Sequence, residues 1–361
     1  MPAFSSSFFT RLAQAILIFG FLSLAVQTAD TDTPDSDPPA TLLVSDVFVV
    51  KPGTEKGGCD GHDVNQWYQD AVILARAAQE ALGDAVAANA NGDTSADSLK
   101  QDGRQVSGHM NLKLARVLII GPENITDVVN ALIDDSDGDD KPWIFCDSTW
   151  AVEESWDDVA RESAVRPNPD GLLIRELYAE YYEENYTKRI AKIDAAPTQE
   201  EKDEEDQPLF PFWSDDLNKY IFDETGDYCS KEGNLAGTDD NFQPNSMTFC
   251  PQNFPADYYA KLDDVPPVTK ARVSIGDLQV TGVTFFHEAF HFALLHEHTP
   301  DIAYPLTQIT RKNPLKTGKK MTAAESMVNP ESYTLYALAY QLGKMNPDYT
   351  FASSASYKRK N

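Results

Sequence analysis

Two histidines four residues apart are the first sign of chemistry in this chain. His287 and His291 lie in the apolar segment 284–295, whose composition predicts a helix. Residues i and i+4 share one face of a helix, so both imidazoles can reach one metal ion. Glu288 is offset around the helix, where its carboxylate reaches a water molecule at the metal instead of the metal itself. The H-E-x-x-H spacing therefore predicts a zinc-dependent enzyme that hydrolyses peptide bonds.

More than one residue could supply the third metal ligand. Asp301, which follows the break at Pro300, is nearer in the chain than Glu325, and we favour it. Glu325, on a later segment, would give a thermolysin-like arrangement, and His296 or His298 could also bind. The simpler account places these two histidines at the end of the helix, where cationic side chains are favoured.

The elements that must position these residues follow from the apolar pattern. Three- and four-residue steps predict a helix over 64–86, and a second helix is expected over 171–193. Short buried strands are expected at 115–121 and 142–146, and the apolar segment 41–50 is expected to be a strand or to lie on the core. The acidic run 199–206 is expected to be a solvated loop.

The chain is expected to hold one main domain. It spans 52–345 and contains an acidic insertion at about 150–225. A polar, proline-rich linker over 26–51 precedes it, and a polar tail over 346–361 follows it. Helices combined with a small sheet predict an α+β fold.

The first 25 residues predict export. They contain one base, Arg11, an apolar run, and small residues at Ser23 and Ala25, which is the layout of a cleaved signal peptide. The run is too short to span a membrane. We therefore expect a secreted, extracellular protein without a membrane segment after cleavage. The net charge of −27 argues against nucleic acid as a partner, because phosphate binding needs clustered lysine and arginine.

The cysteines and two sequons fit a secreted protein. The four cysteines lack the paired C-x-x-C spacing of a zinc site and predict two disulfides. Three pairings are open, and loop closure favours sequential pairing only by a small margin. Asn124 and Asn185 begin N-x-T triplets and are candidate glycosylation sites. The cysteines are Cys59, Cys146, Cys229 and Cys250.

Motifs around the histidines resemble those of a known family. Segment 298–305 keeps Thr299, Asp301 and Tyr304 at the spacing of a GTxDxxYG motif, with His298 and Pro305 in place of the glycines. Segment 329–337 is similar to NADxYxxFA, and an apolar-Cys-Pro segment at 248–251 precedes the histidines. Over about 225–340 the chain resembles the aspzincin metallopeptidases, which include deuterolysins and the lysine-specific endopeptidases of fungi.

This resemblance implies a secreted zinc endopeptidase of the aspzincin type. It implies a zincin-like fold with the H-E-x-x-H helix lining a cleft, sequential disulfides, and polypeptide substrates. A non-catalytic secreted protein that binds zinc, or a surface-interaction protein on the same scaffold, is the alternative. The implied roles are zinc ligation by His287, His291 and Asp301, catalysis by Glu288 and Tyr304, and contact with a substrate lysine by Glu331 and Thr334.

Overall fold

The computed structural model describes residues 42–90, 122–133, 141–163, 165–240, 243–310, 312–352 and 354–359. Leu42–Asn361 form one compact unit. Helices and small sheets are combined in it, so the predicted α+β class is confirmed. The predicted signal peptide, most of the predicted linker and the strand expected at 115–121 lie outside the described residues.

A four-stranded mixed sheet forms one layer of the unit, in the order β1-β2-β7-β6. The strands β1 (Val49–Val50), β2 (Trp143–Phe145) and β7 (Ser246–Phe249) are parallel. The strand β6 (Ala236–Asp239) runs antiparallel to β7 and lies at the edge of the sheet. The strand predicted at 142–146 is confirmed as β2.

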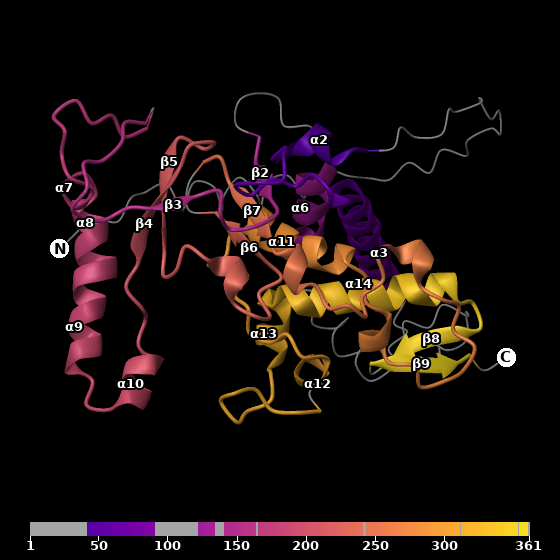
Figure 1. Cartoon of the computed structure of the whole chain (residues 1–361). Helices are drawn as coiled ribbons and strands as arrows, with labels where there is room; N and C mark the ends of the chain where they lie inside the picture. The colour runs from indigo at the N-terminus through magenta and orange to yellow at the C-terminus, as the bar shows by residue number, and fades with distance from the viewer. Residues whose placement is uncertain are drawn as a thin grey trace, which may run out of the picture. The chain divides into compact units, whose positions relative to one another are not determined.

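Four helices pack together, and one of them contacts this sheet (Figure 1). The central one is α11, which carries the H-E-x-x-H motif and contacts the other three as well as β6. Every residue of α11 from Gly282 to His291 is buried. A Cβ atom at Gly282 would lie 2.4 Å from the Cβ of Asp70 on α3, so only glycine allows the two helices to approach this closely. The four are α3 (Val64–Ala90), α6 (Pro122–Ile133), α11 (Gly282–Leu294) and α14 (Pro330–Met345).

The helix predicted over 64–86 is confirmed as α3. The segment 41–50, expected to be a strand or to lie on the core, does so in its described residues, and the main domain extends beyond 52–345 at both ends. Residues 42–50 belong to the fold, since α2 (Val44–Val47) and β1 lie there and Phe48 is buried. The expected polar tail holds a hairpin of β8 (Tyr349–Ala352) and β9 (Ala355–Lys358). Phe351 is buried in it against the core, which the polar composition around it concealed.

The remaining short elements lie mainly in the connections. The helices α12 and α13 lie between α11 and α14 along the chain. Their bounds are α12 (Leu306–Ile309) and α13 (Ala323–Val328), and short 3-10 turns occupy Tyr228–Ser230, Pro251–Asn253, Leu262–Asp264 and Ile275–Leu278.

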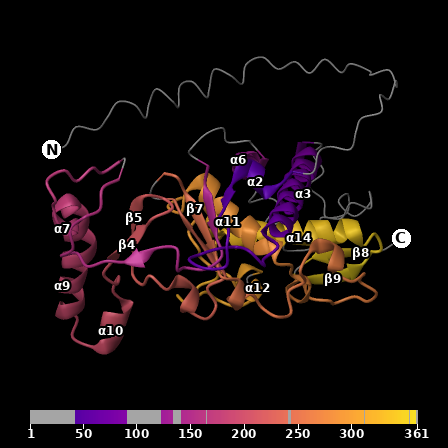
Figure 2. The ribbon, with the colours of Figure 1, turned by 45° about the horizontal axis from the view of Figure 1, so that its top comes forward.

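The acidic insertion has a sheet of its own (Figure 2). It also has a separate hydrophobic core. Side chains from two of its three antiparallel strands pack with tyrosines from the helical segments of the insertion around Trp156, Trp213 and Phe222. The helix expected over 171–193 is confirmed in broad outline, as several short helices and a π-helical turn. The elements are β3 (Val152–Glu153), α7 (Ile174–Leu177), α8 (Ala179–Tyr182), the π-helical turn Glu183–Thr187, α9 (Lys188–Ala195), α10 (Gln199–Glu204), β4 (Phe210–Ser214) and β5 (Lys219–Asp223).

The acidic run 199–206 was expected to be a solvated loop, and most of its described residues are exposed, but it is not a loop. Most of it forms α10. Thr198 begins the helix, because its hydroxyl accepts a hydrogen bond from Glu201 N while the Glu201 carboxylate accepts one from Thr198 N. This capping box and the acidic first turn stabilise a short helix in spite of its repelling charges.

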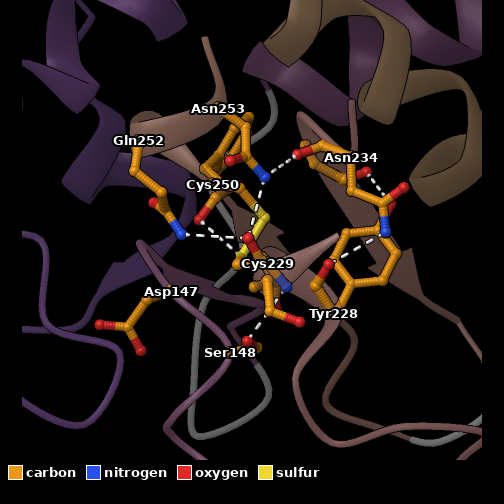
Figure 3. Close-up of a disulfide and its surroundings, with 12 residues drawn as sticks. Asp147, Ser148, Tyr228, Cys229, Asn234, Cys250, Gln252 and Asn253 are labelled. Carbon is orange, nitrogen blue, oxygen red and sulfur yellow. Dashed lines mark hydrogen bonds between the residues drawn. A yellow bond between two sulfur atoms is a disulfide. The ribbon is translucent and has the colours of Figure 1, made fainter. Parts of the chain in front are cut away.

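Two disulfides join the loops at the ends of the parallel strands. Cys59 pairs with Cys146, and Cys229 pairs with Cys250. Around the second bridge, Asn253 Nδ2 donates hydrogen bonds to the carbonyls of Cys229 and Asn234 (Figure 3). The sequential pairing is therefore confirmed. In the part of the chain that the structure describes, no helix is long and apolar enough to cross a membrane.

Candidate metal centre

Three side chains converge at the C-terminal half of α11. His291 Nε2 lies 3.3 Å from His287 Nε2. Asp301 Oδ1 lies 3.0 Å from His287 Nε2 and 3.4 Å from His291 Nε2. Among the described residues, these three form a group whose ligand atoms lie close enough together to hold one metal ion. Two imidazole nitrogens and a carboxylate oxygen at such separations could hold one divalent metal ion.

The two histidines are positioned by α11, and Asp301 is positioned by a turn that follows it. Leu295 ends the helix with φ of 64°, and this left-handed residue reverses the chain. Among residues 295–305, all of them described, Leu295 alone has a positive φ. His298 and Pro305 therefore occupy the two expected glycine positions without backbone strain. The replacement of both glycines therefore does not keep Asp301 from the histidines.

Asn329 fixes the loop that carries Asp301 to the start of α14. Its Oδ1 accepts hydrogen bonds from the backbone nitrogens of Ile302 and Ala303, at 2.9 and 3.0 Å. Its Nδ2 donates to the Ala303 carbonyl and to the Ser332 hydroxyl. Asn329 is fully buried, and no role was predicted for it from the sequence. The sequence feature that could have identified Asn329 is its position at the start of the 329–337 motif.

The outer nitrogens of both histidines have hydrogen-bond partners that orient the rings. His287 Nδ1 lies 3.3 Å from Glu331 Oε2. His291 Nδ1 lies 3.1 Å from Thr299 Oγ1, which in turn donates to the Leu295 carbonyl. When the Nδ1 atoms donate to these oxygens, the Nε2 lone pairs face the centre, which is the tautomer that a metal ion requires. Glu331 and Thr299 therefore orient the two rings as a metal site requires.

Glu288 is buried beside the cluster and bonded to the edge strand. It is 4% exposed, and its Oε2 accepts a hydrogen bond of 2.8 Å from the hydroxyl of Thr238 on β6. Its negative charge contributes to the raised pKa of His287, so it lies within electrostatic reach of the centre. Thr238 belongs to no motif, and its contribution could not be predicted from the sequence.

Tyr304 lies at the exposed rim of the centre. Its ring stacks on His287, with centroids 5.5 Å apart and planes 19° apart. Its hydroxyl hydrogen-bonds with Asp301, and burial together with the Asp301 carboxylate raises the pKa of Tyr304 above its usual value. With 57% of its surface exposed, the side chain is accessible to a molecule that enters the site.

Hydrogen bonds within the cluster favour the charged forms of His287 and Asp301. Burial lowers the pKa of His287, but hydrogen bonds with Asp301 and Glu331 outweigh it and raise this pKa from 6.5 to about 10. Burial raises the pKa of Asp301, but hydrogen bonds with the two histidines outweigh it and hold the carboxyl well below its usual range. Burial raises the pKa of Glu331. A cation that binds here takes the place of the His287 proton.

The alternative third ligands lie outside the cluster. Glu325 caps α13, where its carboxylate accepts a hydrogen bond from Thr322 N. His298 is exposed and pairs with its neighbour Glu297. His296 Nδ1 lies 3.2 Å from His291 Nδ1, on the side of that ring away from the centre.

The two expected substrate contacts have different surroundings. Glu331 forms a hydrogen bond with His287, and its side chain is 14% exposed. Thr334 is fully buried, and its hydroxyl donates to the Pro330 carbonyl. A side chain without accessible surface cannot touch a substrate, so the expected contact with lysine is not available to Thr334. Its burial follows from its place on the inner face of α14.

The two candidate glycosylation sites lie on helical segments. Asn124 is in α6. Asn185 lies in the π-helical turn, is half-buried, and donates through Nδ2 to the Tyr181 carbonyl. Glycosylation remains a prediction for both.

No protein-family model matches the chain, and no curated protein or solved structure is significantly similar to it.

Proposed function

We propose that the chain is a secreted zinc-dependent endopeptidase with a zincin-like fold of the aspzincin type. The observation that carries the proposal is the convergence of His287, His291 and Asp301 beside the buried carboxylate of Glu288. A metal centre with an adjacent acid–base carboxylate is the minimal equipment for metal-assisted hydrolysis. The two disulfides fit an oxidising compartment and hence export.

The donor set favours zinc. Imidazole nitrogens suit zinc, copper, iron and nickel, whereas calcium and magnesium prefer oxygen ligands. Ligands at zinc bond lengths of about 2.0–2.1 Å occupy tetrahedral corners about 3.3–3.4 Å apart. The observed separations of 3.3, 3.0 and 3.4 Å are close to that value. When bound, zinc supplies Lewis-acid chemistry that polarises a carbonyl oxygen and lowers the pKa of water toward ~7.

The acid–base work falls to Glu288. Its carboxylate is buried, and Thr238 fixes one of its oxygens. It is the group placed to accept a proton from the attacking water and to deliver that proton to the leaving amine. Tyr304 is assigned as the hydrogen-bond donor to the oxyanion that develops on the peptide carbonyl. To act in this way, its hydroxyl must break its hydrogen bond with Asp301 and donate to the substrate instead.

The edge strand β6 provides a place for a polypeptide substrate. Among the described strands it pairs only with β7, so its outer edge can form backbone hydrogen bonds with an extended peptide. Because Thr238 joins β6 to Glu288, a peptide on this edge passes beside the acid–base carboxylate. This placement favours an endopeptidase over a hydrolase of small molecules.

The test is cleavage of an unfolded polypeptide by the purified secreted protein. We expect cuts that a zinc chelator abolishes, that added zinc restores, and that are absent with Glu288→Gln. The variant keeps the three ligands, so its zinc content should equal that of the wild type. Zinc bound at full stoichiometry without any cleavage would contradict the proposal and point to the non-catalytic alternative.

A further inference from the structure

The acidic insertion forms one wall of a cavity next to the edge strand. The cavity has a volume of about 280 Å³. Residues of β6 also line it, together with Trp150 and Ala151. The insertion contributes Phe212, Ile221, Phe222 and Asp223, and β6 contributes Gly237, Thr238 and Asp239.

This cavity adjoins the candidate metal centre. Thr238 lines the cavity, and its hydroxyl is bonded to the carboxylate of Glu288. Tyr228 also lines it, and burial, together with the charges of Glu288 and Asp301, raises the pKa of this tyrosine. In a peptide that pairs with β6, a side chain close to the cleaved bond would therefore reach the cavity.

The walls of the cavity are built to a fixed shape. A Cβ atom at Gly226 would lie 1.9 Å from the ring of Phe212, and one at Gly237 would lie 3.0 Å from the ring of Tyr228. Glycine at these two positions lets the aromatic rings lie directly against the backbone. Phe222 is stacked on Trp156 within the core of the insertion. A preformed apolar pocket needs no ordering when a side chain enters it.

One carboxylate gives the cavity a preference for positive charge. Asp223 lies at the end of β5, and its Oδ1 accepts a hydrogen bond from Glu224 N. In the described part of the chain, no lysine, arginine or histidine forms an ion pair with it. The neighbouring Asp239 has Lys219 at 3.8 Å. An apolar side chain in the pocket would desolvate the Asp223 carboxylate without compensation.

We propose that the insertion is a specificity element and that this cavity receives an arginine or lysine side chain of the bound polypeptide. The aliphatic stem lies against Trp150 and Phe222, and the cationic end lies at Asp223. Such a side chain supplies both the apolar contact and the charge that the walls require. This inference rests on the proposed peptidase function and adds the substrate class that its site prefers.

The test compares peptides that differ in one charge. A single arginine is moved through the positions on both sides of the cleaved bond, and each peptide is paired with one that carries citrulline, a neutral analogue of the same length. We expect one position at which arginine raises kcat/KM, and Asp223→Asn should lower the arginine-to-citrulline ratio there about tenfold. A second pair of peptides carries lysine or its uncharged analogue norleucine at the same position.

Two further variants guard against indirect effects. Asp206→Asn removes the same charge from an exposed site on the insertion and should keep the ratio of the wild type. Ala151→Leu fills the cavity and should lower cleavage of the arginine peptide more than that of the citrulline peptide. Thermal unfolding of each variant shows that it is folded.

The outcomes separate this inference from the function on which it rests. Zinc-dependent cleavage in which no position prefers arginine, or in which Asp223→Asn and Asp206→Asn behave alike, overturns the inference and leaves the peptidase standing. If the wild type cleaves none of the peptides, both fall.

Discussion

Glu331 is expected to act on the metal centre through His287, and replacing it with glutamine isolates that effect. The substitution keeps the size of the side chain and an acceptor oxygen but removes the charge. Loss of a residue that hydrogen-bonds to a ligating histidine lowers metal affinity by about 10–100-fold. The Nδ1–Oε2 separation of 3.3 Å exceeds the usual length of a charge-assisted bond, so we expect the lower end, about tenfold or ~1.4 kcal/mol.

The assay is competition for zinc between the protein and a chromophoric chelator at constant pH. Glu325→Gln is the matched control, because it makes the same change on an exposed helix cap that glutamine also tolerates. Peptidase activity of Glu331→Gln should fall at limiting zinc and recover at saturating zinc, as a purely structural defect would not. Wild-type zinc affinity in folded Glu331→Gln would refute the reasoning.

Three further outcomes follow from other contacts. Thr238→Val removes the hydrogen bond to Glu288 and should lower kcat about tenfold at unchanged zinc content, as steady-state kinetics will show; an unchanged kcat would exclude an orienting role. Burial raises the pKa of Asp70 to about 6 from 3.8, so its ionisation costs the folded state stability as pH rises through this window. Denaturant unfolding of Asp70→Asn should lack this loss of about 3 kcal/mol between pH ~4 and ~7, and the same pH slope in both proteins would contradict it. Replacing Cys229 and Cys250 by serine opens a loop of 21 residues, and the free energy of unfolding should fall by about 3 kcal/mol in the same assay; a fall below ~1 kcal/mol would show that the bridge does not constrain the unfolded chain.

Much of the helical framework could be predicted because its signals are local. The apolar spacing over 64–86 indicated α3, and the buried run at 142–146 indicated β2. The charge of the acidic run at 199–206 predicted a loop, but the Thr198 capping box stabilises a helix there. The polar residues after 345 concealed a hairpin whose single buried anchor, Phe351, is a weak signal in sequence.

The sequence by itself determined that His287 and His291 face one point and that Glu288 stands beside them, since four residues make about one helical turn. Tertiary structure decided what completes the centre. Asp301 reaches it because Leu295 reverses the chain and Asn329 anchors the returning loop.

Other features of the site depend on contacts between residues that are far apart in the chain. Glu331 meets His287 across 44 positions, and Thr238 meets Glu288 across 50. The cavity exists because the sheet of the insertion lies against β6. Such contacts arise from the packing of separate elements, and no local periodicity encodes them.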